Sequence, residues 1–167
     1  MELEFEELHA GDTARIENMS ALASSIVKEY YDPLLGAEQN DYMIEMFQSA
    51  RSIAKQLEEG KRYYFASLGG EDVGFICFYP HDDVMYLSKL YLRADMRGKG
   101  FARPMLALVA DEAKKSGFDA IELNVNKHNR TQQIYEKLGF VRVRSEKNDI
   151  GSGYYMDDYV YRLEILY

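Results

Sequence analysis

The residues best suited to chemistry form a short basic segment, residues 93–103, in a 167-residue protein with a formal net charge of −8. This segment holds four cations, Arg93, Arg97, Lys99 and Arg103, around glycines at positions 98 and 100. Glycines let a backbone turn tightly and bring its N–H groups close to a ligand, while the cations attract anions. The segment is therefore predicted to bind a phosphorylated cofactor.

Two predicted elements enclose this segment. The apolar run at residues 84–92 is typical of a strand, and residues 105–115 have the apolar period of a helix. A helix that begins at Gly100 or Phe101 presents N–H groups without intrahelical partners and the positive end of its dipole. A strand, a glycine-rich turn and a helix N-terminus in this order indicate a cradle for a diphosphate.

The turn differs from two other phosphate-binding motifs. A dinucleotide fingerprint requires a third glycine where this chain has Arg103, although Glu122 is placed to imitate its ribose-binding acid. A Walker loop requires a Gly-Lys-Ser/Thr sequence that the segment lacks. A dinucleotide-binding oxidoreductase module stays as a disfavoured alternative.

Two motifs resemble those of one known family. The pattern Arg97-x-x-Gly100-x-Ala102 is similar to the pyrophosphate loop of the GNAT superfamily of N-acetyltransferases, which bind acetyl-CoA. The second signature of that family resembles residues 129–140, which read Asn129-x5-Tyr135-x-x-Leu138-Gly139-Phe140. Both motifs occur in the family's order, and the resemblance covers roughly residues 62–166.

The resemblance implies a donor and a set of site residues. Acetyl-CoA is the expected donor, and no metal is expected. The expected cofactor-binding residues are Leu90, Tyr91 and Leu92 through their backbone N–H groups, Arg97, Gly98, Lys99, Gly100, Phe101, Ala102 and Arg103 in the loop, and Asn129, which also caps a helix. Tyr135 matches the family tyrosine near the CoA sulfur, so it is the expected catalytic acid. A phenol of pKa ~10 can protonate a thiolate whose acid has pKa ~8.5.

The general base and the acceptor site are less constrained. Many relatives place a glutamate on the strand that corresponds to residues 84–92, but this chain has no acid there. Glu29, Asp157 and Asp158 stay as alternatives for a carboxylate that helps a proton leave through water. The expected acceptor-binding residues are Glu29, Tyr30, Asp157 and Asp158.

The division of charge favours a cationic acceptor. Most of the acidic excess lies in residues 1–83, and carboxylates beside tyrosines suit an elongated amine. The favoured acceptor is a small-molecule primary amine such as a polyamine, attacked directly in a ternary complex. The alternatives are a protein or peptide amine and, in another class, a non-catalytic acyl-CoA-binding regulator.

The order of predicted elements, β-α-α-β-β-β-α-β-α-β-β, indicates an α/β protein with a mixed sheet and helices on both faces. Its family counterpart is the GNAT-like, mostly antiparallel sheet. The first helix is expected to end at residues 31–33, and one second helix is expected to carry the apolar positions from Met43 to Leu57 and to end at Gly60. A single domain, residues 1–167, is expected to comprise a helical acceptor-side arm (1–60) and an acetyl-CoA-binding core (84–140).

The composition is typical of a cytoplasmic enzyme. The first residues lack the features of a signal peptide, and no apolar run is long enough to span a bilayer, so no membrane partner is expected. Cys77 is the only cysteine and lies in an apolar strand, while the three histidines show no metal-ligand spacing. The basic segment lacks interleaved aromatics, which disfavours nucleic acid. A homodimer is left open.

Overall fold

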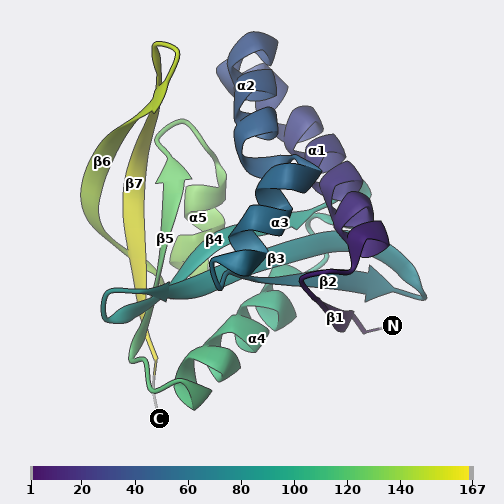
Figure 1. Ribbon diagram of the computed structural model, residues 1–167. Coiled ribbons are helices and arrows are strands. Elements are labelled where there is room, and N and C mark those ends of the chain that lie inside the picture. The colour runs from purple at the N-terminus through teal and green to yellow at the C-terminus, as the bar shows by residue number, and fades with distance from the viewer. Residues whose placement is uncertain (1, 166–167) are drawn as a thin grey trace. The chain divides into compact units, whose positions relative to one another are not determined.

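The computed structural model describes residues 2–165, which form seven strands and five α-helices (Figure 1). The elements are β1 (Glu4–Leu8), α1 (Thr13–Leu35), α2 (Ala37–Gln48), α3 (Ala50–Glu58), β2 (Arg62–Leu68), β3 (Glu71–His81), β4 (Val84–Leu92), a 3₁₀ turn η1 (Ala94–Met96), α4 (Ala102–Lys115), β5 (Ala120–Asn126), α5 (Thr131–Lys137), β6 (Val141–Gly151) and β7 (Tyr154–Glu164). The strands are hydrogen-bonded in the order β1-β2-β3-β4-β5-β7-β6. The β4–β5 pair is parallel, whereas β1–β2, β2–β3, β5–β7 and β6–β7 are antiparallel. The predicted α/β class with a mixed, mostly antiparallel sheet is confirmed.

The chain divides into two compact units that alternate along the sequence. Unit 1 comprises Met1–Tyr79 and Lys89–Met105, and unit 2 comprises Pro80–Ser88 and Leu106–Tyr167. Met1 and residues 166–167, which the single-domain prediction includes, lie outside the described residues. That single domain stays a prediction, and each unit is described by itself below.

Unit 1 is built around an apolar core between helices α1 and α3 and strands β1–β3. Figure 1 shows these helices in purple and blue beside the three strands. Buried members of this core are Leu8, Ile16, Met19, Ala23, Ile26, Val27, Ile53, Tyr63, Phe65, Phe75 and Cys77. The α1 members recur every three or four residues, and that spacing aligns them on one helical face. Cys77 is fully buried in this core.

Helix α1 ends later than predicted. The Asp12 side chain accepts a hydrogen bond from the backbone N–H of Arg15, which is a usual N-cap contact. The expected end at residues 31–33 is wrong, because α1 continues through Pro33 to Leu35 and stops at Gly36. A proline so close to the end removes only one helical hydrogen bond, and the N–H of Gly36 still bonds to Asp32 O at 3.0 Å.

The expected second helix is two helices. Ser49 has extended backbone angles (φ −67°, ψ 154°) and separates α2 from α3, and its side chain accepts the N–H of Ser52 as the N-cap of α3. The last carbonyls of α2 bond to side chains instead of to the next helical turn. The Ser20 hydroxyl donates to Gln48 O at 2.7 Å, and the Lys89 ammonium donates to Phe47 O at 2.7 Å. These two contacts favour the break.

Unit 2 contains most of α4, helix α5 and the long β6–β7 hairpin at the C-terminal end of the chain (Figure 1). Its buried apolar residues are Val84, Met85, Leu87, Leu106, Val109, Ala113, Ala120, Ile121, Leu123, Val125, Phe140, Val160, Tyr161 and Ile165. Strand β5 pairs along its whole length with β7, from Ala120 with Glu164 to Asn126 with Asp158. This pairing fixes which side chains of the two strands share a face.

Candidate functional site

Residues 97–101 form a loop before α4, and residues 102–103 are the first residues of that helix. Gly98 and Gly100 have φ angles of 76° and 82°, a backbone region that other residues rarely adopt. A Cβ built at either position would have no other atom within 4 Å. The positive φ angles, and not a lack of space, therefore favour glycine at these positions. Helix α4 begins at Ala102, within two residues of the predicted start. Lys99 and Arg103 are exposed.

Arg93 serves to hold the start of this loop. Its side chain forms ion pairs with Asp95 at 2.8 Å and Glu71 at 2.5 Å, and its N–H donates to Val73 O at 2.8 Å. These contacts tie the end of β4 to β3. Arg93 is therefore structural, in contrast to the exposed cations further along the loop.

Arg97 is directed toward helix α1. Its Nη1 lies 2.9 Å from a carboxylate oxygen of Glu29, and its guanidinium lies 4.8 Å from the ring centre of Tyr30. Its Nη2 is buried and has no hydrogen-bond partner among the described residues. The structure thus brings together a predicted cofactor-binding residue and two predicted acceptor-binding residues, Glu29 and Tyr30.

Strand β4 approaches β3 very closely just before this loop. A Cβ built on Gly74 would lie 2.5 Å from the carbonyl oxygen of Tyr91 and 2.9 Å from a methyl group of Leu92. Such distances exclude any side chain at position 74 unless the backbone shifts. Leu90, Tyr91 and Leu92 are the residues whose N–H groups are expected to hold the thioester arm, so Gly74 sets where those groups lie.

Lys89 on the same strand is an unexpected buried cation. Its side chain is 6% exposed, and its ammonium donates to Phe47 O, to the side-chain oxygens of Gln48 (3.0 Å) and Gln56 (3.2 Å), and to the Tyr63 hydroxyl. Burial lowers the pKa of Lys89 to about 8. Lys89 fastens the end of α2 to the sheet.

We expect the unfolding free energy of the protein to change with pH as Lys89 titrates. Below pH 8 the folded protein carries the full cost of a buried ammonium, and this cost is relieved between pH 8 and the unfolded pKa of ~10.4. Relative to Lys89→Met, the wild type should therefore gain about 1 kcal/mol of unfolding free energy between pH 7 and 8.5. Urea unfolding of both proteins at several pH values measures this difference.

The comparison ends at pH 8.5 because Cys77 affects the stability at higher pH. Burial raises the pKa of Cys77 to about 11, so its contribution to stability is lost only as the pH rises above its ordinary value near 9. Parallel stability curves for wild type and Lys89→Met up to pH 8.5 would show that Lys89 does not titrate in this range.

The predicted acid, Tyr135, lies on the short helix α5 of unit 2. Its ring is half-buried and packs edge-on against Phe140, with ring centres 5.5 Å apart. Gly139 and Phe140 end the helix with N–H bonds to Glu136 O (3.1 Å) and Tyr135 O (3.0 Å), which is a Schellman motif. The ring of Tyr135 is thus held by Phe140, and its backbone carbonyl is held by the N–H of Phe140.

Asn129 caps α5 from one residue further out than a usual N-cap. It is 6% exposed, and its side-chain oxygen accepts the N–H of Thr131 at 2.9 Å, while Arg130 is the boundary residue. The Tyr161 hydroxyl of β7 contacts Gln132 and Glu136 at 3.2 Å each and fastens the helix to the strand. The predicted cap is therefore observed as a contact to the first helical residue.

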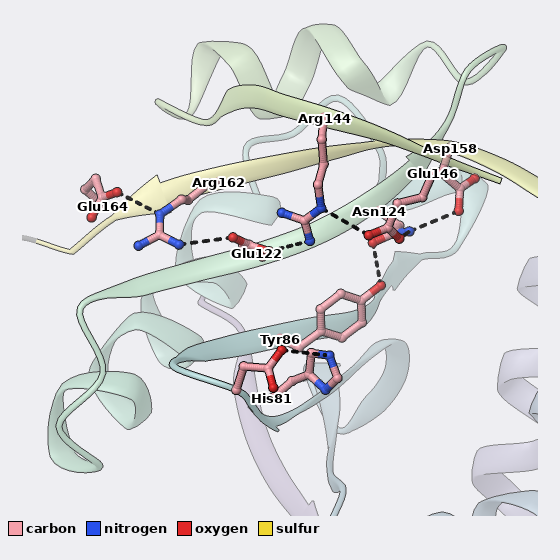
Figure 2. Close-up of polar contacts among 10 residues, drawn as sticks. His81, Tyr86, Glu122, Asn124, Arg144, Glu146, Asp158, Arg162 and Glu164 are labelled. Atoms are coloured by element: carbon pink, nitrogen blue, oxygen red, sulfur yellow. Dashed lines mark hydrogen bonds and ion pairs between the residues drawn. The ribbon is translucent and has the colours of Figure 1, made fainter. Parts of the chain in front are cut away.

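A polar network covers one face of β5 and its neighbours in unit 2 (Figure 2). Asn124 is at its centre. Its side-chain oxygen accepts from the Tyr86 hydroxyl at 2.8 Å, and its NH₂ group donates to Glu146 (3.2 Å) and Asp158 (3.3 Å). Further along β5, Glu122 lies between Arg144 (3.0 Å) and Arg162 (3.1 Å).

The two aspartates of β7 have different environments. Asp157 forms an ion pair with Lys127 at 3.0 Å, whereas Asp158 is 3% exposed and bonds to the Asn124 amide. Burial raises the pKa of Asp158, and repulsion from Asp157 and Glu146 raises it further. Neighbouring strand residues face opposite sides, which explains why only one of the two joins the network.

The family follows from a direct comparison. The model of the acetyltransferase (GNAT) family matches residues 23–140, which is more than half of the chain. The chain belongs to the GNAT family of acetyltransferases. Its donor is therefore acetyl-CoA.

Other GNAT proteins are similar over most of their length. An uncharacterized N-acetyltransferase, YvbK, from Bacillus subtilis is 25% identical over 129 residues, which cover 74% of this chain and 83% of YvbK. The PaiA N-acetyltransferase from Thermoplasma acidophilum, solved with coenzyme A, has a TM-score of 0.80 at 19% identity and covers 98% and 99% of the two chains. The yncA acetyltransferase from Salmonella typhimurium, solved with acetyl-CoA, has a TM-score of 0.64 at 15% identity and covers 99% and 95%. These structures share the fold.

The residues of the loop are chemically suited to a diphosphate. An anion would supply the acceptor that Arg97 Nη2 lacks, and Lys99 and Arg103 are exposed beside it in sequence. The sequence reasoning missed the network around Asn124. The alternation Glu122-x-Asn124-x-Asn126, which places three polar side chains on one strand face, was the signal that could have indicated it.

Two further properties concern membranes and metal ions. None of the helices within residues 2–165 is long and apolar enough to cross a membrane. In the same part of the chain, no three His, Cys, Asp or Glu side chains are grouped so that they could hold a metal ion.

Proposed function

We propose that this protein transfers the acetyl group of acetyl-CoA to a primary amine of a small cationic molecule by direct attack in a ternary complex. The observation that carries the proposal is the environment of Asp158, a buried carboxylate with a raised pKa in the same unit as Tyr135. A carboxylate that takes a proton and a phenol that gives one are the two groups that amine acetylation needs.

The donor would be held by the loop and by strand β4. The backbone N–H groups of residues 98–103 and the cations Arg97, Lys99 and Arg103 would bind the diphosphate. The N–H groups of Leu90, Tyr91 and Leu92 would bind the pantetheine arm and polarise the thioester carbonyl as its oxygen becomes negative. Asn129 would contact the arm while it caps α5.

The reaction would then need three events at the acceptor. The ammonium loses a proton to Asp158 through water, the free amine attacks the carbonyl carbon, and the tetrahedral intermediate expels the CoA thiolate. As the amide forms, its nitrogen gives up its second proton to water. Tyr135 protonates the thiolate and regains a proton from solvent, and Asp158 releases its proton to solvent. The bond formed is C–N and the bond broken is C–S, so no oxidant or reductant is required.

Asp158 is preferred as the base over the two other carboxylates that the sequence left open. Glu29 and Asp157 each form an ion pair with a cation, Arg97 and Lys127, so both carboxylates are already engaged by a side chain of the protein. Asp158 is held by a neutral amide, and its pKa is raised toward the range in which a general base is effective.

We expect Asp158→Asn to lower kcat/KM for the amine by about 10²-fold, the usual range for removal of a general base. Asp157→Asn is the matched control, because it removes an equal charge from the adjacent residue and should change kcat/KM much less. Initial rates of CoA release measure both. Equal losses in the two variants would remove Asp158 from the role of base.

The acceptor is proposed to be a polyamine or a similar small polycation. The acidic excess of residues 1–83 supports this choice, although the carboxylates at the α1–α2 turn are largely neutralised. Asp32 and Asp41 both bind Lys28, at 2.9 and 3.0 Å, and Glu29 binds Arg97. Support therefore also comes from the repulsion that Asp157 and Glu146 exert on Asp158, which a cationic group nearby would relieve.

A screen with matched amines tests the acceptor. Spermidine and 1,6-hexanediamine should be acetylated with a lower KM than hexylamine, and the KM of the diamines should rise more steeply with salt. This is expected because raising the ionic strength from 0.15 M to 1 M shortens the screening length from about 8 Å to about 3 Å. If hexylamine is the better substrate at every salt concentration, the charge argument fails.

The same screen separates the alternatives. Acetylation of a peptide N-terminus or lysine, with no reaction of the diamines, would indicate a protein N-acetyltransferase. Tight binding of acetyl-CoA without turnover of any amine would indicate a non-catalytic acyl-CoA-binding regulator. The presence of Tyr135 and of the complete loop motif disfavours that role.

A further inference from the structure

Three consecutive residues of α1 contact both of the segments in unit 1 that are proposed to hold the donor. Glu29 and Tyr30 contact the loop through Arg97, at 2.9 Å and 4.8 Å. Tyr31 contacts strand β4, where its hydroxyl lies 3.4 Å from that of Tyr91. One turn of α1 is therefore linked to the diphosphate loop and to the strand before it.

The hydrogen bonding of Arg97 is incomplete in this arrangement. Nη1 is used by Glu29, and the face of the guanidinium lies over Tyr30, but the buried Nη2 has no acceptor among residues 2–165. A buried N–H group without a partner is costly and rare in folded proteins. Guanidinium groups bind phosphate oxygens well, because their donors match the spacing of those oxygens. The unpaired nitrogen is thus suited to an oxygen of the diphosphate.

We infer that Glu29 and Tyr30 are positioning residues for the donor. The carboxylate and the ring fix the plane of the Arg97 guanidinium and leave Nη2 for a diphosphate oxygen of acetyl-CoA. An arginine already held in its binding orientation loses less side-chain entropy when the ligand arrives. This inference rests on the proposed role of residues 97–103, and it assigns Glu29 and Tyr30 to the donor and not to the acceptor.

The first experiment measures CoA binding to Glu29→Gln by calorimetry, with no acceptor present. The affinity should fall about fivefold, because the neutral amide no longer holds the guanidinium by charge. Glu17→Gln is the matched control, since Glu17 is another exposed glutamate of α1. Loss of a negative charge by itself favours an anionic ligand, so the control should bind CoA as tightly as the wild type or slightly more tightly.

A second arm uses a donor without the diphosphate. The kcat/KM for S-acetylpantetheine should be the same in Glu29→Gln and in the wild type, whereas that for acetyl-CoA should fall. The acceptor KM should not change. A general disturbance of α1 would lower kcat/KM for both donors, so equal losses would overturn the inference, as would a raised acceptor KM with unchanged CoA affinity.

A double-mutant comparison completes the test. Arg97→Ala should weaken CoA binding about ten- to a hundredfold, and Arg97→Ala combined with Glu29→Gln should be no weaker than Arg97→Ala alone. Additive losses, or CoA binding to Glu29→Gln that is unchanged or tighter, would overturn the inference while the proposed loop stands. Unchanged binding in Arg97→Ala would instead overturn the proposed role of Arg97 in the loop.

Discussion

Replacement of Tyr135 by phenylalanine should lower turnover by about 10²–10⁴-fold, with little change in acetyl-CoA affinity. The change deletes the proposed proton donor and keeps the ring, so the edge-on packing against Phe140 is preserved. Helix α5 should also stay in place, since its stop at Gly139 and its attachment through Tyr161 do not involve the phenol. The loss should therefore appear in kcat.

The measurement requires conditions in which chemistry limits the rate, which single-turnover experiments provide. Tyr155→Phe is the control, because Tyr155 lies in unit 2 on β7, is 48% exposed and has no proposed role in catalysis. It should keep wild-type turnover. A Tyr135→Phe variant that also keeps wild-type single-turnover rates would show that the hydroxyl is not the acid.

The second large effect is expected from Gly74→Ala. The added methyl group would lie 2.5 Å from the Tyr91 carbonyl oxygen, which is backbone and cannot rotate away. Strands β3 and β4 must then separate, at a cost of about 1–3 kcal/mol of unfolding free energy. The N–H groups of Leu90, Tyr91 and Leu92 would move with β4, so kcat/KM for acetyl-CoA should fall by more than the loss of folded protein explains.

Gly11→Ala separates this steric effect from a general cost of replacing glycine. Gly11 has a φ of 92° and no atom within 4 Å of a built Cβ, so its replacement strains the backbone without a collision. It should lower the melting temperature and leave kcat/KM per folded molecule unchanged. If Gly74→Ala melts and reacts like the wild type, the close approach of the two strands does not position the thioester arm.

The parts of the fold that follow from local signals were predicted well. Strand β4 has the predicted bounds, because an apolar run and the turn that follows it define the strand. The break at Ser49 was missed, since the apolar period continues across it from Phe47 to Ala50. It depends on bonds from Ser20 and Lys89, which are distant in sequence and meet α2 only in the folded chain.

In the candidate site, too, contacts between residues distant in sequence could not be predicted. Motif spacing led to the prediction of Arg97 and Tyr135, because the residues of each motif are near one another in sequence. It could not show that Arg97 would bind Glu29, 68 positions earlier, or that Asp158 would be buried against Asn124 while Asp157 faces Lys127. These contacts depend on which segments pack together in the folded chain. Glu29, Asp157 and Asp158 carry the same charge, so the sequence alone did not distinguish their environments.

The alternation of the two units along the chain limits how this protein could be recombined with its relatives. Unit 1 is made from two separate stretches, Met1–Tyr79 and Lys89–Met105, and one boundary falls inside strand β4 and another inside helix α4. A chimaera that exchanged only the N-terminal stretch would pair a foreign Gly74 and Glu29 with the native Tyr91 and Arg97. New specificities in such a chain should therefore arise more readily from point substitutions than from a single crossover.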